Sequence, residues 1–481
     1  MKRLDPAFWD DSAVRAAAAA WDFGTVVRLF RRHTGLSQTA VARLVSIDQA
    51  EVSRLERGQK KIRDRRQLAQ WSEALGMPVD LLGPLPNAAS HPTTTAHSGA
   101  SPVLQDGPGQ LLLPAGRNLP PSLLPTLTSP AASFRGNLLW LSPSSDLEAW
   151  SSMPLRALLA ATRIIDGARR YFVMDAREGS PSPEGRTHAI PAAFELDDLT
   201  YGILWAVAGF DSALLGDDAA LHEVFLQAPE KLLGGSGSAI TSGSLTDGSH
   251  MLIGSQVCAW FILEQRDALG GDPVFWTREQ RGEEAATWLF FEHKHRYLKH
   301  MAPQRPQSGA GRGFCVPRQE VVASPTYERV LLFLAIALME SYGITTWLTE
   351  EPELQETDGF VLVPGRRVAI ATWVRAAPVP RTSLTASAQM LRNFTDVTGH
   401  ARAHTVTAGA TPGQRLVATA DYLGLDRPWL ARRCRQLAAE GTTTLARPRS
   451  RHLSLDALDI ACSYVAGQFA LEAGTRAGAT R

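Results

Sequence analysis

The sequence predicts a mainly α-helical protein of several domains, and three observations lead to this fold class. Apolar residues recur at spacings of three and four in two regions, 21–83 and 135–410, as they do on the buried face of a helix. A segment rich in Pro, Ser, Thr, Gly and Ala, 84–134, separates these regions. The length of 481 residues, 44% hydrophobic and 20% charged, suits roughly two to four domains of ordinary globular composition.

The first twenty residues and the cysteines bear on where the protein acts. Residues 1–20 are expected to be an N-terminal extension, because three aspartates and a short alanine run do not make the apolar stretch of a secretory signal. The longest apolar run, Val330–Met339, is about half of what a bilayer span requires. The four cysteines lie far apart without a CxxC pair, which favours reduced, buried thiols over a zinc site. We therefore expect a cytoplasmic protein of the bacterial, nucleoid-associated type, with no membrane partner, no metal and no cofactor.

Residues 84–134 are expected to form a flexible linker. The runs PLPNAASHPTTTAHSGASP and LPPSLLPTLTSP belong to this segment. Such a composition does not bury enough apolar surface to offset the conformational entropy of the chain.

The region 135–410 is predicted to be a mainly helical domain for regulation or dimerisation. Apolar spacing predicts helices at Asp146–Tyr171, Leu196–Leu215, Gly254–Ala268 and Glu279–Met301. Asp197 is the expected N-cap of the second helix. The nearly all-apolar stretch 328–346 predicts a central core helix. β-branched runs around a Pro-Gly pair predict an antiparallel hairpin at Gly359–Arg375.

The segment Leu36–Gly58, LSQTAVARLVSIDQAEVSRLERG, contains two short helical patterns separated by a tight break. Ser37 is the expected N-cap of the first helix and Asp48 that of the second. Flanking helices at Phe23–His33 and Arg65–Leu75 are expected to pack against this pair. The result is a small helical domain with one core.

This segment resembles the phage-repressor (Cro-like) family of helix-turn-helix transcription regulators. The resemblance lies in Leu36-Ser37-Gln38, Val41-Ala42 and the run VSRLERG that ends at Gly58, all at the family spacing. Ser46 stands at the turn, where the family usually has glycine. The resemblance implies that residues 21–83 are a DNA-binding domain, in which Glu56 supports the fold rather than touching DNA.

The second helix of the motif also has the surface that a recognition helix needs. Its outward positions have small or polar side chains, which can enter the roughly 12 Å wide major groove. From Arg54 to Arg66, seven basic residues stand against two acidic ones, an excess that suits phosphate. The alternative is a helical protein-interaction module that does not bind DNA.

The resemblance further implies roles for single residues. Gln38 would lie near a phosphate, and Gln49 would read a base, preferably adenine, through two hydrogen bonds. Ala50 offers a methyl contact to thymine, Glu51 an acceptor to cytosine, and Arg54 a donor to guanine or phosphate. The predicted DNA-binding residues are Gln38, Asp48, Gln49, Ala50, Glu51, Ser53, Arg54, Arg57, Lys60 and Lys61.

A second candidate lies near the C-terminus, at Val417–Leu455. A short helix, a Gly-Leu turn and an arginine-rich helix precede two β-like pieces, Thr442–Leu445 and His452–Leu455. Through LGLDR, which begins at Leu423, and LAAEG, which ends at Gly441, the segment resembles the winged helix of the cyclic-AMP receptor protein family. The candidate DNA-binding residues of this winged helix, residues 411–475, are Arg427, Arg432, Arg449 and Arg451.

Two readings of the C-terminal segment stay open: a second DNA-binding module, or a winged helix used for packing or dimer contact. Pro428 and Trp429 stand where the recognition helix begins, and Ala431 stands where that family commonly has a polar residue. The phosphate-binding cassette of that family is not found, so cyclic-nucleotide binding is not carried over.

The sequence offers no catalytic motif, and we predict that the protein is not an enzyme. GxSxG, HExxH and phosphate-loop patterns are absent. His293, His295 and His300 share no helix face suited to a metal and are expected on a solvated basic surface. The tryptophans of the 135–410 region are expected mainly in the core, with an apolar effector pocket as the alternative.

These patterns predict a sequence-specific, dimeric transcription regulator that binds double-stranded DNA. Its body would bind a small effector or a protein partner, and its linker would let two heads adjust to paired half-sites. The main alternative is a protein-interaction scaffold tethered to DNA by its head. A weaker one is an enzyme with a DNA-binding head.

Overall fold

The computed structural model describes residues 8–9, 11, 14, 17, 23–45, 47–58, 71, 75, 77 and 104–479, the last range without 143, 154–155, 179–187, 227–244, 270–271, 303–309 and 375–379. The chain divides into two compact units, Met1–Ala96 and His97–Arg481. Each unit has its own hydrophobic core, so we describe them separately as the head and the body.

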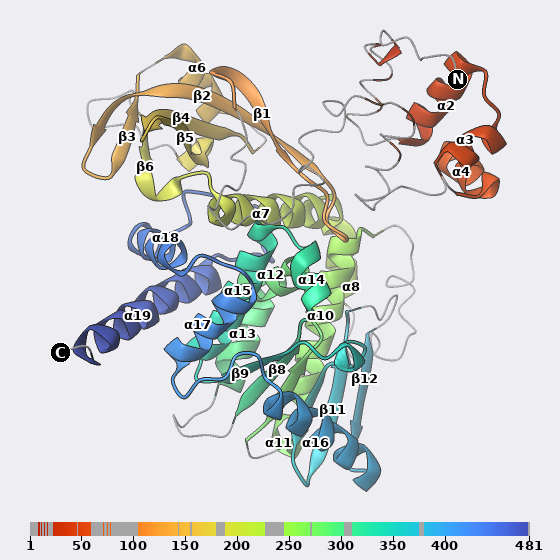
Figure 1. Cartoon of the computed structure of the whole chain (residues 1–481), viewed down its shortest axis with the longest axis vertical. Coiled ribbons are helices and arrows are strands. Elements are labelled where there is room, and N and C mark those ends of the chain that lie inside the picture. The colour runs from red at the N-terminus through yellow and green to blue at the C-terminus, as the bar shows by residue number, and fades with distance from the viewer. Residues whose placement is uncertain are drawn as a thin grey trace. The chain divides into compact units, whose positions relative to one another are not determined.

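The head is a small helical domain (Figure 1). Its helices include α2 (Phe23–Thr34), α3 (Gln38–Leu44) and α4 (Gln49–Glu56). Val26 and Phe30 of α2, Val41 of α3, and Val52 and Leu55 of α4 are buried in one cluster. The helices predicted at 23–33 and within 36–58 are therefore confirmed. The helix predicted at 65–75 lies almost wholly outside the described residues.

The first sheet of the body begins inside the segment expected to be a linker. Strands β1 (Gly107–Leu113) and β2 (Ser122–Arg135) pair antiparallel along the whole of β1. The prediction of a flexible linker is therefore wrong from 107 onward, and residues 84–103 lie outside the described chain. The physical reason is alternation: Leu111, Leu113 and Leu124 point into the core of the body from paired strands.

The completed first sheet is mixed. Its other strands are β3 (Leu138–Leu141), β4 (Leu158–Ile165), β5 (Ala168–Asp175) and β6 (Ala189–Pro191). The order is β5-β4-β2-β3-β6 with β1 on β2, and β2 pairs with β4 in parallel. The helix predicted at Asp146–Tyr171 is wrong beyond α6 (Ser145–Ser151). Leu158–Ala161 are buried in succession, a run that periodicity does not distinguish from a buried helix.

A layer of helices lies between the two sheets (Figure 1), and α7 (Asp198–Gly216) packs there against α15 (Thr326–Ser341). Asp197 caps α7 as predicted, its carboxylate accepting from the Thr200 amide. By length and composition α7 could cross a membrane, but 78% of its most apolar window is buried inside the body, as in a core helix. The other helices of this part of the chain are α8 (Asp218–Leu226), α10 (Asp247–Glu264), α11 (Arg266–Leu269), α12 (Gly282–Phe290), α13 (Glu292–Met301) and α14 (Arg318–Ala323).

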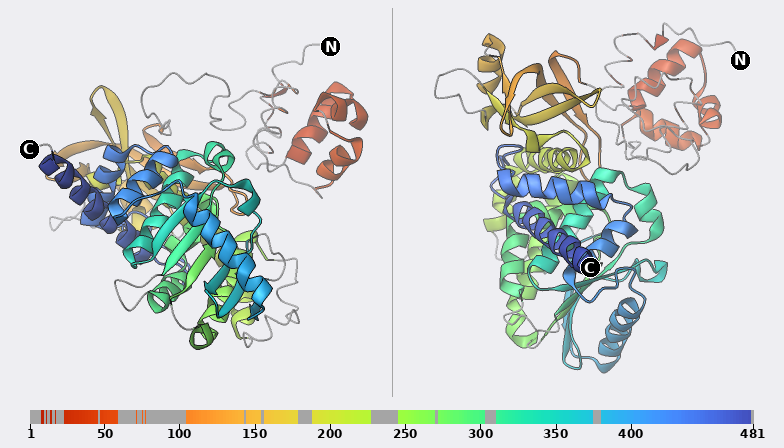
Figure 2. Two further views of the ribbon diagram at one scale, coloured as in Figure 1. Left: turned by 60° about the horizontal axis from the view of Figure 1, so that its bottom comes forward. Right: turned by 60° about the vertical axis from the view of Figure 1, so that its left-hand side comes forward.

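The second sheet is also mixed and lies beyond these helices. Its strands are β7 (Val274–Thr277), β8 (Gly311–Cys315), β9 (Thr345–Thr349), β10 (Phe360–Val363), β11 (Arg367–Thr372) and β12 (Arg381–Thr385). They follow the order β12-β11-β10-β7-β8-β9, with β7, β8 and β9 parallel. Helix α16 (Ala388–Ala403) covers one face, as Figure 2 shows. The other face packs against α10.

The second sheet confirms one prediction and limits another. β10 and β11 form the predicted antiparallel hairpin, and Gly365 in its turn adopts a φ of 70°, which favours glycine. With two six-stranded sheets in the described chain, the prediction of a mainly α protein holds only in part. Short 3₁₀ turns occur at Ala176–Glu178, Ala192–Phe194 and Pro352–Leu354.

The C-terminal segment belongs to the body. It consists of α17 (Pro412–Tyr422), α18 (Arg427–Glu440) and α19 (Asp456–Ala479). The strands expected at Thr442–Leu445 and His452–Leu455 do not form, so the predicted wing is wrong. Leu430 of α18 and Leu458 of α19 join the core of α15 instead, because they lie on faces buried between these helices. The segment is thus continuous with the body rather than a separate domain.

Candidate nucleic-acid interface

Helix α4 has one buried and one solvent-facing side. Val52 and Leu55 enter the core of the head, whereas Asp48, Gln49, Ala50, Arg54 and Arg57 are exposed. Glu51, Ser53 and Gln38 are partly exposed. The structure therefore places the described members of the predicted DNA-binding set on or beside one surface helix. Lys60 and Lys61 lie outside the described residues.

A series of side-chain hydrogen bonds connects the first residue of α4, Gln49, to its last residue, Glu56. The Gln49 Nε2 donates to Gln38 Oε1 at 2.7 Å, and the Gln38 Nε2 donates to Glu56 Oε2 at 2.7 Å. Arg31 Nη1 donates to both carboxylate oxygens of Glu56, at 2.8 and 2.9 Å. Arg28 Nη2 donates to the Glu56 carbonyl oxygen at 2.5 Å. Glu56 therefore supports the fold, as the resemblance implies, by joining α2, α3 and α4.

This series of hydrogen bonds determines how the side-chain amides of Gln38 and Gln49 are oriented. A carboxylate accepts hydrogen bonds and does not donate them, so Gln38 turns its NH₂ group to Glu56 and its oxygen to Gln49. Gln49 must then donate to Gln38, which leaves its oxygen and one N–H for another partner. Gln49 thus presents an oriented acceptor and donor at the exposed start of α4.

The two predicted N-caps behave differently. Ser37 Oγ accepts from the Ala40 amide at 3.1 Å, so this cap is confirmed. Asp48 occupies the N-cap position of α4 with extended backbone, but its side chain accepts no capping hydrogen bond. The exposed carboxylate of Asp48 is therefore not engaged in capping α4.

Sequence reasoning missed the arginines that hold this surface. Arg28 and Arg31 lie on α2, which was expected only to pack through its apolar side. Their partner Glu56 is more than twenty residues away, so spacing gives no signal for the contact. The sequence gives one indication of this contact: α2 has basic residues near its end, and the motif contains an acidic residue, Glu56.

The structure disperses the four predicted arginines of the C-terminal segment. Arg427 pairs with Asp421 at 3.2 Å, and Arg432 is exposed on α18. Arg451 pairs with Asp218 at 3.4 Å. Arg449 is partly buried, and its backbone amide donates to the carboxylate of Asp211. Because no wing forms, Arg449 and Arg451 do not have the position that the winged-helix resemblance implies.

The arginine that anchors α18 to the rest of the body, Arg433, was not among the predicted DNA-binding residues. Arg433 is 1% exposed, and its Nε donates to Asp197 Oδ2 at 2.6 Å. Its Nη1 donates to the Ala193 carbonyl at 2.9 Å, and its Nη2 donates to the Glu195 carbonyl at 3.1 Å. The inner face of α18 is thereby fixed to the segment before α7.

Comparison with known proteins supports the head alone. Residues 22–85 match a family model described as a helix-turn-helix domain. The chain thus has an N-terminal helix-turn-helix domain, a class of domain that suggests DNA binding. No curated protein and no solved structure matched the chain in these comparisons.

Proposed function

We propose that the protein is a sequence-specific transcription regulator whose head reads double-stranded DNA through α4. The observation that supports this most is the fixed orientation of Gln49. Its side chain is held by Gln38 at the exposed start of α4, with an acceptor and a donor left over. Adenine presents the complementary pair, the N7 acceptor and the N6 amine, in the major groove.

The remaining exposed residues of α4 suit the neighbouring positions of such a complex. Arg54 and Arg57 are exposed near the end of the helix, where guanidinium groups can bind guanine or phosphate. We propose that Lys60 and Lys61, which lie outside the described residues, bind the phosphate backbone. The protein would act in the cytoplasm, on a bacterial-type nucleoid, by binding rather than by catalysis.

The experiment compares two substitutions in the full-length protein, after its bound sites have been mapped across a genome. Gln49→Ala is expected to cost about 1–3 kcal/mol of binding free energy on a mapped site and little on random DNA. Lys60→Ala is the matched control and is expected to weaken both alike, because a phosphate contact is independent of sequence. Equal losses for the two variants on both DNAs would contradict base reading by Gln49.

We further propose that the protein binds as a homodimer assembled through its body. One repressor-type head contacts few base pairs, and two heads on paired half-sites raise affinity and specificity together. Mapped sites should then be inverted repeats, and sedimentation of the full-length protein on one such site should give two chains per duplex. One chain per duplex at saturation would rule the dimer out.

A further inference from the structure

Two histidines at the C-terminal end of α16 lie side by side on the surface of the body. His400 belongs to the last turn of this helix, and His404 is the residue that caps it. Both residues are exposed, their ring centroids are 4.1 Å apart, and the ring planes are inclined by 30°. Among the twelve histidines of the sequence, only these two stand four residues apart, the spacing at which two histidines of one helix bind a single metal ion.

The hydrogen bond of the His404 ring determines which of its two nitrogens can bind a metal. Nδ1 of His404 lies 2.9 Å from the carbonyl oxygen of His400. Because a carbonyl oxygen only accepts hydrogen bonds, Nδ1 carries the proton, and the neutral ring has its lone pair on Nε2. Metal-binding histidines usually have this arrangement, in which the other ring nitrogen donates to a backbone carbonyl or a carboxylate. His404 therefore presents Nε2 as the nitrogen that can bind a metal.

His300, at the end of α13, shows that such a hydrogen bond does not by itself require a second histidine. Its Nδ1 lies 2.7 Å from the carbonyl oxygen of Arg296, which is also one turn earlier in its helix. His300 is exposed like His404, but its neighbour four residues earlier is an arginine, whose side chain has no lone pair to offer a metal. Capping of the helix therefore accounts for the hydrogen bond of His404, and it does not account for the second ring beside it.

The charges that α16 places next to this pair favour a cation. Asp396 is exposed one turn before His400, and residues four apart share one side of a helix. Its carboxylate therefore adds negative charge beside the two rings. Arg402 is also exposed, but it is two residues from each histidine, a spacing that does not place it on their side of the helix. On the side of α16 that has the two histidines, the neighbouring charge is thus negative.

The pair forms an open site, in which the protein supplies only two ligands. In the part of the chain that the structure describes, no group of three or more His, Cys, Asp or Glu side chains is placed to hold a metal ion. Water would therefore fill the remaining coordination positions, as it fills the open position of a catalytic zinc site. The expectation of no metal was drawn from the cysteines and from the histidines of α13, so it does not concern this pair.

We propose that His400 and His404 together bind one divalent transition-metal ion of the Zn²⁺ class through their ring nitrogens. Imidazole suits Zn²⁺, Ni²⁺ and Cu²⁺, whereas Mg²⁺ and Ca²⁺ prefer oxygen ligands. With metal–nitrogen bonds of about 2.0–2.1 Å, two adjacent ligand nitrogens lie roughly 3 Å apart. Rings whose centroids are 4.1 Å apart reach this distance by turning slightly toward each other.

The ion would hold the end of α16 to the segment that follows it. In that segment, the Val406 amide donates to the carbonyl oxygen of Leu348 at 2.8 Å, and Thr405 Oγ1 accepts from the Leu348 amide at 3.1 Å. Residues 405–406 thus cover the outer edge of β9, the last strand of the second sheet. A metal that joins His400 to His404 crosslinks the turn leading into this cover, and it should stabilise the folded form because the unfolded chain does not hold the two rings together.

Calorimetric titration of the full-length protein with Zn²⁺ tests whether the two histidines act as one site. His400→Ala and His404→Ala should each weaken the binding roughly tenfold or more, since each removes the effective concentration that one ligand gives the other. The double variant should bind little more weakly than either single variant. His300→Ala is the matched control and should leave the affinity unchanged. If Zn²⁺ does not bind, or if neither single variant weakens its binding, the proposal is overturned.

Nuclear magnetic resonance of the wild-type protein with isotope-labelled histidines locates the ion. The ring signals of His400 and His404 should shift together as Zn²⁺ is added. Mg²⁺ at the same concentration should shift neither signal, because it prefers oxygen ligands. A shift of one of the two rings without the other would mean binding to a single surface histidine and would overturn the shared site. This measurement needs no variant, so it decides the question even where a substitution prevents folding.

Hydrogen exchange of the full-length protein tests the effect on the fold. Zn²⁺ should slow the exchange of the amides of residues 401–406 in the wild type and not in His404→Ala. Unchanged exchange in the wild type at saturating Zn²⁺ would contradict a crosslink between the two histidines. This site goes beyond the proposed function and does not depend on it. Zn²⁺ binding without specific DNA binding would remove only the regulator, and specific DNA binding without Zn²⁺ binding would remove only the metal site.

Discussion

Two pairs of helices, α3–α4 in the head and α17–α18 in the body, share a chain order of helix, tight turn and helix. In the head, the outer side of α4 is exposed and its polar residues are arranged by Gln38, Glu56 and Arg31. In the body, α18 packs against α19 and is fixed through Arg433 to the segment before α7. Arg54 of α4 is thus exposed, whereas Arg433 of α18 is buried.

The difference shows that helix order alone does not specify a DNA-binding surface. A recognition helix needs an uncovered polar side, and this depends on which other elements pack nearby. In α18, the helix that resembles a recognition helix in sequence, Arg433 is instead a buried cation with hydrogen-bond partners on all three of its nitrogens. Four experiments test this difference between the head and the body.

The largest expected effect is that of Arg433→Met on the stability of the body. The substitution leaves Asp197 without its cation, and breaking a buried pair in this way costs about 3–5 kcal/mol. Urea unfolding of the full-length protein, followed by tryptophan fluorescence, measures it. The matched control Arg432→Met changes the exposed neighbour and should stay within about 0.5 kcal/mol. A loss of DNA affinity in Arg432→Met without loss of stability would make α18 a DNA-contacting helix after all.

A smaller effect is expected for Glu56→Gln in the head. The neutral amide loses the charge-assisted bonds from Arg31 and Gln38, and we expect about 1.5–3 kcal/mol less stability. Hydrogen exchange of amides in α2, α3 and α4, measured in the full-length protein, reports the head separately from the body. Asp48→Asn, at an exposed carboxylate that makes no cap, is the control. Equal protection in both variants would mean that Glu56 does not join the helices.

The body should lose stability in mild acid. Burial lowers the pKa of His293, His295 and His452 in the folded state. As the pH falls through about 6.5, the unfolded chain binds protons that the folded body does not, so stability present at higher pH is lost. Urea midpoints should therefore fall between about pH 7.5 and pH 5.5. His293→Gln should reduce this slope, and an unchanged slope would exclude His293 as a contributor.

The smallest effect concerns the two N-caps of the head. Ser37→Ala removes a capping hydrogen bond and should cost about 0.5–2 kcal/mol, whereas Asp48→Ala should cost less. Exchange rates of the amides at the start of α3 and α4 measure the two separately. A greater loss at Asp48 would show that its carboxylate caps α4 in solution.

The parts of this fold that the sequence predicts correctly depend on nearby residues. The helix-turn-helix, the Asp197 cap and the β10–β11 hairpin each form within one short stretch. The strand at Leu158–Ile165 was missed because its burial results from pairing with β2 and β5, which no local pattern records. The expected linker was wrong for a similar reason, since its leucines are buried only once β1 meets β2.

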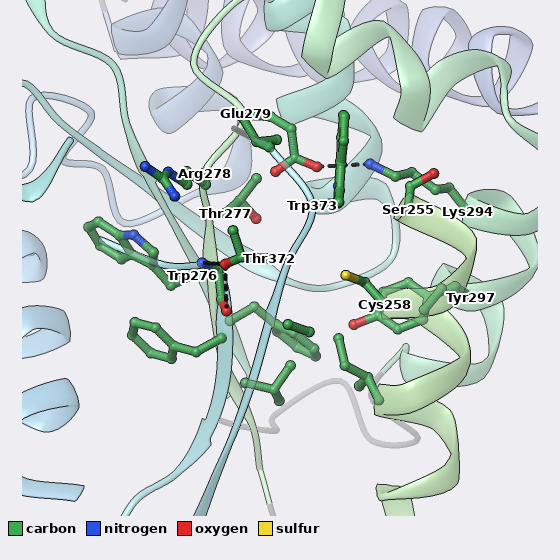
Figure 3. A pocket seen from close by; sticks show the side chains of 18 of the residues that line it. Ser255, Cys258, Trp276, Thr277, Arg278, Glu279, Lys294, Tyr297, Thr372 and Trp373 are labelled. Atoms are coloured by element: carbon green, nitrogen blue, oxygen red, sulfur yellow. Dashed lines mark hydrogen bonds and ion pairs between the residues drawn. The ribbon is translucent and has the colours of Figure 1, made fainter. Parts of the chain in front are cut away.

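The candidate sites also divide into features that depend on nearby residues and features that depend on distant ones. The exposed residues of α4 were predictable because the motif fixes the helix face. The buried ion pair of Lys294 and Glu279 (Figure 3) was not predictable, because the two residues belong to separate elements and meet only in the folded body. The histidines expected on a solvated surface show the same limit: His295 is buried and hydrogen-bonded to Tyr342 at 2.8 Å.

Asp197 serves two distant parts of the body at once, because its carboxylate caps α7 and also accepts from Arg433 and from Trp429 Nε1. Truncation of the chain before α17 would therefore remove the two α18 side chains that donate to this carboxylate and would expose the apolar face of α15. Proteolysis or a premature stop codon in the last seventy residues should then unfold the whole body rather than remove only its last helices. A fusion partner that displaces these helices from the C-terminus should have the same effect.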